Sequence, residues 1–199
     1  MPSLTFKKLP NEKQNRILRA GIKEFSRVPL NEGSIANIIK DAKIPRGSFY
    51  QYFEDKEDIF YYILEVHSQN IKKYLLKSLL KNKGDVIDSF IELYIFIIEK
   101  INNPQAEGYF RNIFLNMNYD LERRFTPNLD DNLNDVINLI DMNKLNITNK
   151  LQLIYIVDII EAIMIRNIIH SYKRSISKEK NIDIFIKEIY LIRDGLYKN

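Results

Sequence analysis

The chain has 199 residues, 45% of them hydrophobic, no cysteine and a formal net charge of +4. This length allows one large or two small units with a real core, and the missing cysteine excludes disulfides, thiolate metal ligands and cysteine nucleophiles. The opening stretch MPSLTFKKLP has no apolar signal core, and no uncharged run approaches the ~18 residues of a membrane span. We therefore expect a cytoplasmic protein without membrane association.

Positive charge is concentrated at one end of the chain. Residues 1–56 hold 11 lysines and arginines against 6 acidic residues, a net of +5, whereas the remainder holds 19 against 20. A basic segment beside a balanced one is what binding to a polyanion by counterion release requires.

Residues 34–53 predict two short helices joined by a tight turn. Ser34 stands as N-cap before the apolar-periodic run IANIIKDA, Lys43 and Ile44 form the turn, and Pro45 suits the first position of a helix over 45–53. The second helix carries basic, hydroxyl and aromatic side chains of the kind that contact phosphates and base edges in a major groove.

Within this region the apolar residues are expected to form the core, because a short three-helix unit needs apolar anchors. The expected core residues are Phe25, Ile38, Phe49 and Phe53. Asp55 is expected to cap the next helix, with Lys56 in its first turn.

Three motifs carry a resemblance to a known family: ILRAGIKEF at 17–25, SIANIIKDAKIPRGSFYQYF at 34–53 and KEDI at 56–59. Together they resemble the DNA-binding domain of the TetR/AcrR family of bacterial transcriptional regulators, over about the first third of the chain. Lys43 stands where this family usually has glycine, and Pro45 where it usually has serine or threonine.

The resemblance implies an all-α fold. Residues 1–56 would be an N-terminal three-helix domain with its helix-turn-helix at 34–53, and residues 57–199 a larger helical domain for effector binding and dimerisation. The residues expected to contact DNA are Ser34, Lys43, Arg46, Gly47, Ser48, Tyr50, Gln51, Tyr52 and Lys56.

Beyond residue 56 the pattern is helical almost throughout, with only six glycines and six prolines in the whole chain. A long helix over about 58–81 would link the two domains, with its first half on the DNA-binding core and its second half on the effector domain. Further helices are expected over 86–101, from Pro104 to about 117, over 129–142, from Thr148 as N-cap to about 173, and over 182–197.

The helix over 151–169 is apolar almost all round, so we expect a partner subunit to cover part of it. In the resembled family the last two long helices form a four-helix dimer bundle. The expected dimer-interface residues are Ile156, Ile160, Ile163, Ile186 and Ile189. A buried helix in a monomer is the alternative.

Aromatic and polar residues of the C-terminal part are candidates for an effector pocket, since a few polar groups in an apolar cavity orient a ligand. They are Tyr94, Tyr109, Phe110, Phe114, Glu161, Arg166 and His170. Ordinary core packing is the alternative for the aromatic residues. The last three could instead sit at the dimer interface or form an acid/base group. No phosphate loop, catalytic motif or metal-ligand pattern is present, so no cofactor or metal is expected.

The favoured function is a homodimeric repressor that binds a near-palindromic operator in double-stranded DNA and is released by a small lipophilic effector. A regulator or activator controlled by a protein partner, without a small-molecule pocket, is a second hypothesis. A helical enzyme or binding protein with a vestigial helix-turn-helix is the third.

Overall fold

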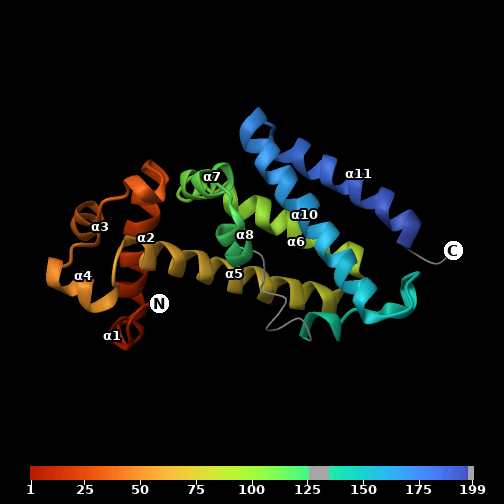
Figure 1. The fold of residues 1–199 in the computed structure, drawn as a ribbon, viewed down its shortest axis with the longest axis horizontal. Helices are drawn as coiled ribbons and strands as arrows, with labels where there is room; N and C mark the ends of the chain where they lie inside the picture. The colour runs from red at the N-terminus through yellow and green to blue at the C-terminus, as the bar shows by residue number, and fades with distance from the viewer. Residues whose placement is uncertain (126–134, 197–199) are drawn as a thin grey trace. The chain divides into compact units, whose positions relative to one another are not determined.

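The computed structural model describes residues 1–125 and 135–196. These residues are mostly helical and none of them lies in a β-strand, so the predicted all-α fold is confirmed (Figure 1). Among the helices of this described part, none combines the length and apolarity of a membrane-spanning segment.

The helices of the first 81 residues are α1 (Leu4–Lys7), α2 (Asn11–Arg27), α3 (Ile35–Ala42), α4 (Arg46–Tyr52) and α5 (Lys56–Lys81), with a 3-10 turn η1 (Leu30–Glu32) after α2. The later helices are α6 (Val86–Ile101), α7 (Glu107–Leu115), α8 (Tyr119–Phe125), α10 (Lys150–Arg174) and α11 (Lys178–Leu196), with a 3-10 turn η2 (Met142–Lys144) before α10.

Short polar side chains begin several of these helices by accepting a hydrogen bond from a free backbone N–H. Asp55 accepts from the Asp58 N–H at 2.7 Å, as predicted. Asp85 accepts from the Asp88 N–H at 3.0 Å. The predicted cap at Thr148 is wrong by one residue, because the Asn149 side chain accepts from the Gln152 N–H.

Other boundaries differ from the prediction for local reasons. A turn in which the Ala106 N–H donates to the Asn103 carbonyl delays α7 until Glu107. Of the helix expected over 129–142, residues 129–134 lie outside the described part, and the helical segment ends at Ile137. Helices α1 and α8 were not expected, and α11 begins four residues earlier than predicted.

The chain divides into two compact units. The first consists of residues 1–68 and 103–125, so α7 and α8 pack with the helices of the predicted DNA-binding domain. The second consists of residues 69–102 and the described residues from 135 to 196. The functional division expected at residue 56 stays a prediction.

The core of the first unit is built around aromatic rings. The predicted core residues Phe25, Ile38, Phe49 and Phe53 are all buried, which confirms them. Phe60 of α5 packs edge-on against Phe25 of α2 at 5.1 Å between ring centroids, so the first half of α5 lies on this core as expected.

The core of the second unit is formed by α6, α10, α11 and the end of α5. Tyr74 of α5 stacks on Phe96 of α6 at 4.1 Å, and Tyr94 of α6 stacks on Phe185 of α11 at 3.9 Å. At the α10–α11 contact, Glu188 accepts hydrogen bonds from Arg166 at 2.5 Å and from Asn167 at 2.7 Å. Ring stacking and this polar bridge fix α5, α6, α10 and α11 against one another.

Candidate DNA-binding interface

Helices α3 and α4 form the predicted helix-turn-helix. The turn is made by Lys43, whose backbone is left-handed at φ 51° and ψ 51°, followed by Ile44, whose N–H donates to the Ile39 carbonyl at 3.2 Å. Ile44 is buried, so the turn is anchored by its second residue. Lys43 therefore adopts the conformation that favours glycine, at a cost of about 1 kcal/mol or more.

The position of α3 depends on Glu24, a buried carboxylate of α2. Glu24 accepts hydrogen bonds from the Ser34 N–H at 2.8 Å, from Asn37 Nδ2 at 3.1 Å and from Arg27 Nη2 at 2.6 Å. The bond from Arg27 is the main reason that the pKa of Glu24 lies below its ordinary value. The negative charge of Glu24 lies near the N-terminus of α3, where the positive end of the helix dipole stabilises it.

This arrangement corrects the expected role of Ser34. The residue is the N-cap of α3, but its side chain makes no capping hydrogen bond, and its backbone N–H donates to Glu24 of α2. Sequence reasoning missed Glu24, although a glutamate beside the core residue Phe25 on an amphipathic helix was a signal.

The nine predicted contact residues fall into three groups. Lys43, Arg46, Gly47, Tyr50 and Gln51 are exposed; Ser34, Ser48 and Lys56 are half-buried; Tyr52 is buried. The exposed group lies in α4 and in the turn before it, and Phe49 of α4 is buried in the core. Five of the nine predicted residues are therefore accessible to solvent.

Two of the less exposed residues already have partners within the chain. Lys56 donates from Nζ to the Asn31 carbonyl at 2.6 Å, which joins the start of α5 to η1. Tyr52 is only 5% exposed, with its ring edge-on to Phe6 and with Lys13 Nζ 5.6 Å from its centroid. Tyr52 is therefore mainly a core residue of this domain, and its predicted DNA contact is the least accessible of the nine.

Gly47 has no packing partner that requires glycine. A Cβ built on it meets no atom within 4 Å, and it lies inside α4, where glycine costs about 0.5–1 kcal/mol relative to alanine. Within the described chain, no steric contact accounts for this glycine.

Comparison with known proteins identifies the family. Residues 17–63 match the family model described as bacterial regulatory proteins, tetR family, and residues 85–196 match the tetracyclin repressor-like C-terminal domain. The second match alone spans more than half of the chain. The chain belongs to the TetR family. Members of this family are DNA-binding transcriptional regulators and not enzymes.

Relatives and solved structures agree with this assignment. The chain is 32% identical over 88 residues to the HTH-type transcriptional regulator AcrR of Shigella flexneri, covering 44% of this chain and 41% of that protein. It is 33% identical over 76 residues to HbdR of Aromatoleum sp. (strain CIB), covering 36% of this chain and 33% of that protein. These matches span less than half the length of either relative.

Among solved structures, a TetR-family regulator of Syntrophomonas wolfei is similar with a TM-score of 0.69 at 22% identity, over 92% of this chain and 96% of that one. The reduced form of NemR of E. coli is similar with a TM-score of 0.62 at 18% identity, over 90% and 95%. At these identities the likeness concerns the fold.

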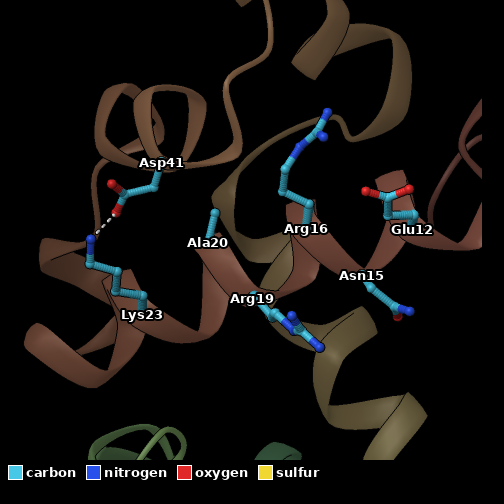
Figure 2. Close-up of a pocket in the computed structure, with 7 residues that line it drawn as sticks. All are labelled: Glu12, Asn15, Arg16, Arg19, Ala20, Lys23 and Asp41. Carbon is cyan, nitrogen blue, oxygen red and sulfur yellow. Dashed lines mark ion pairs between the residues drawn. The ribbon is translucent and has the colours of Figure 1, made fainter.

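A pocket of about 410 Å³ lies between α2 and α3 in the TetR-type DNA-binding domain (Figure 2). Lys23 pairs with Asp41 across it at 2.9 Å, and Arg16 Nε donates to the Ala42 carbonyl at 2.9 Å. Its lining consists of Glu12, Asn15, Arg16, Arg19, Ala20, Lys23 and Asp41. Such a charged lining does not suit a lipophilic ligand, and sequence reasoning did not anticipate it.

The predicted effector residues are divided between the two units. Tyr109, Phe110 and Phe114 belong to the first unit, whereas Tyr94 belongs to the second. The buried Tyr109 hydroxyl donates to the Phe60 carbonyl at 3.2 Å. Burial raises the pKa of Tyr109, so its hydroxyl stays protonated and able to donate.

In the second unit, the buried Tyr94 hydroxyl donates to Asn181 Oδ1 at 2.8 Å, and burial raises its pKa as well. Arg166 is exposed and bound to Glu188, while Glu161 and His170 are half-buried.

In residues 1–125 and 135–196, no group of acidic and histidine side chains is arranged to hold a metal ion.

The predicted dimer-interface residues, which stay a prediction, differ in their exposure within the single chain. Ile160 and Ile189 are fully buried within the single chain, and Ile156 is 6% exposed. Their side chains have little or no surface left for a partner, whereas Ile163 and Ile186 are half-buried. Helices α6 and α11 cover one side of α10. The apolar residues that α10 leaves exposed lie on another face.

Proposed function

We propose that this TetR-family regulator is a homodimeric repressor that binds a near-palindromic operator through α4 and is released by a small lipophilic ligand. The proposal rests on the difference in solvent exposure between the side chains of α4. Its apolar side chains are buried, while Arg46, Gly47, Tyr50 and Gln51 are exposed together at one surface. That surface has the side-chain types that read base edges and phosphates.

The first turn of α4 supplies the base contact in this proposal. Arg46 is exposed at the first helical position, where its fork of donors can reach the acceptors of guanine. Tyr50, 49% exposed one turn later, and Lys43 in the preceding turn supply phosphate contacts. The bare backbone at Gly47 permits close approach of the nucleic acid, which accounts for a glycine that the chain itself does not require.

Dimer formation uses the exposed face of α10. Leu151, Tyr155 and Ile159 are 53%, 55% and 52% exposed and follow one another at intervals of four residues, so they form one apolar stripe. A second copy of the stripe, related by a twofold axis, covers it. Two copies of α4 would then meet two half-sites, which a near-palindromic operator provides.

The proposed release by a ligand rests on membership of the TetR family. Repression and ligand response are typical of the family. Tyr94 and Tyr109 already have internal hydrogen-bond partners, so a lipophilic ligand would have to displace packed side chains or open space beside them. Control by a protein partner, or activation in place of repression, is the alternative that the experiment has to separate.

The proposal is tested by selecting DNA sites and by titrating the protein with them. The full-length protein selects DNA sites from a random double-stranded pool, and fluorescence anisotropy then measures affinity for the selected site and for the DNA upstream of its gene. A two-fold-symmetric consensus bound by a dimer supports the proposal, and selection of no sequence contradicts it. Lipophilic compounds that raise the melting temperature are then added, and loss of operator binding distinguishes ligand release from control by a partner.

A further inference from the structure

Helix α1 is a short element that packs on the end of the recognition helix α4. Its N-cap Ser3 accepts a hydrogen bond from the Phe6 N–H at 3.2 Å through its hydroxyl oxygen. Phe6 is completely buried, with its ring 4.8 Å from that of Phe53, 6.0 Å from that of Tyr52 and 5.6 Å from that of Tyr62. A single buried ring therefore attaches α1 to the end of α4 and to α5.

Ser3 also bonds directly to the last turn of α4. Its N–H donates to the Tyr52 carbonyl at 2.9 Å, and its hydroxyl donates to the Gln51 carbonyl at 2.6 Å. The last carbonyls of a helix have no donor within that helix, so they need one from elsewhere. The Ser3 hydroxyl thus has two roles at once, accepting from α1 and donating to α4.

These contacts matter because α4 is short. A helix of seven residues is not stable alone in water, so its position is set by the elements that pack on it. At its beginning the exposed residues Arg46 and Gly47 are free of such packing, while at its end Ser3 and Phe6 supply it. Side chains that bind a ligand have to be held within about 0.5 Å of their productive place.

We propose that α1 is a positioning element for DNA recognition, in which Ser3 and Phe6 hold the end of α4 and so determine how Arg46 and Tyr50 meet the operator. This inference rests on the proposed function of α4. It adds residues that touch no DNA and that act through the helix they fasten. Their loss lowers operator affinity and specificity even where the protein stays folded.

A plain stabilising role for α1 is the competing explanation, and substitutions at Ser3 separate the two. In Ser3→Asp the carboxylate still accepts from the Phe6 N–H, because aspartate caps helices as well as serine does, but it has no proton to donate to the Gln51 carbonyl. Ser3→Thr keeps both bonds. Thr5→Asp places the same charge on an exposed position of α1 and leaves the bond to Gln51 intact, so it is the matched control.

The measurement is the ratio of affinities for the selected operator and for an unrelated DNA of equal length, by anisotropy at several salt concentrations, with full-length protein shown to be folded by circular dichroism. We expect Ser3→Asp to lower this ratio roughly tenfold relative to Thr5→Asp, as loss of one hydrogen bond to a fixed carbonyl implies. Ser3→Thr should retain the ratio of the parent.

Phe6→Leu provides a second test that adds no charge. It keeps an apolar side chain in place but removes the ring contacts to Tyr52 and Phe53, and we expect a lower ratio here too. If Ser3→Asp matches Thr5→Asp and Phe6→Leu matches the parent, α1 only stabilises the domain and the inference is overturned. A parent protein that selects no DNA contradicts the proposed function instead, so the two failures are distinguishable.

Discussion

Asn112 of α7 donates a 2.8 Å hydrogen bond from its side-chain amide to the carbonyl oxygen of Phe25 in α2. One turn earlier in α7, Gly108 lies against Ser26 of α2 so closely that a Cβ on the glycine would be 2.7 Å from the Ser26 carbonyl oxygen. A hydrogen bond and a close backbone approach thus join α7 to the last turn of α2, within the same compact unit as the DNA-binding helices.

The first prediction concerns this contact. Gly108→Ala forces the backbones of α7 and α2 apart, so it should lower the free energy of unfolding by about 1–3 kcal/mol. Gly195→Ala is the matched control, because the added Cβ there meets no atom within 4 Å. Urea denaturation of both variants checks the prediction, and equal unfolding midpoints would show that α7 and α2 are not in such close contact.

The second prediction concerns Gly47. Gly47→Ala should raise the free energy of unfolding by about 0.5–1 kcal/mol, because alanine favours the helix and the methyl group enters open space. The same methyl group should weaken operator binding, since it stands where the nucleic acid approaches. Thermal denaturation and anisotropy titration measure the two effects, and unchanged affinity would remove Gly47 from the interface.

The third prediction uses two lysines that share one backbone conformation. Lys43 and Lys83 both have φ 51°, so replacing either with glycine relieves a left-handed residue and should stabilise the fold by about 0.5–1 kcal/mol. Only Lys43→Gly should weaken DNA binding and lower the slope of log affinity against log salt by about 1, as loss of one phosphate contact does. A matching loss of affinity in Lys83→Gly would mean that the effect does not come from a contact in the turn.

The fourth prediction concerns pH. The pKa of Glu24 is lower in the folded chain than its ordinary value of 4.5, so its ionised form stabilises the fold fully above that value and this contribution is lost as the pH falls. Glu24→Gln should cost about 1–3 kcal/mol at pH 7 because it disrupts the bonds to Arg27, Ser34 and Asn37.

Chemical denaturation from pH 7 down to pH 3 measures that difference. The gap between parent and Glu24→Gln should narrow below pH 4.5, where the parent loses its carboxylate. Glu12→Gln, which removes an exposed carboxylate from the same helix, is the control. A gap that stays constant over this range would show that the charge of Glu24 is not what holds α3.

The fifth prediction separates assembly from folding on α10. Ile159→Asp adds a charge to a 52% exposed position, so it should leave the helix folded but shift a dimer to monomers. Ile160→Asp places a charge at a fully buried position, so it should unfold the chain. Sedimentation velocity and circular dichroism distinguish these outcomes. A parent protein that sediments as a monomer would contradict the proposed dimer.

Most of this fold could be predicted from the sequence, because the features that define a helix lie close together along the chain. Apolar spacing and capping residues located the helix-turn-helix and five of the longer helices to within a few residues, and the core assignments of Phe25 and Phe49 were confirmed. The four-residue helix α1 was missed, since its only apolar anchor is Phe6 and one ring leaves no periodic pattern.

The site was harder to predict, since accessibility depends on which distant element covers a residue. Tyr52 was predicted to contact DNA, but Phe6 of α1 packs against its ring and little of it is exposed. Ile160 was predicted to face a partner subunit, yet it is buried within its own chain. Composition does not tell which face of an apolar helix its own chain covers. Glu24 was overlooked for the same reason, because its partners Ser34 and Asn37 lie in another helix.

The left-handed lysine at position 43 and the glycine at position 47 have a consequence for protein engineering. A library selected only for heat resistance should replace both residues, with glycine and alanine respectively, and so enrich variants that no longer regulate. Two selections from one library, for folding and for promoter occupancy, would disagree at these positions and agree in the core. That disagreement would outline the DNA-contacting surface without a structure of the complex.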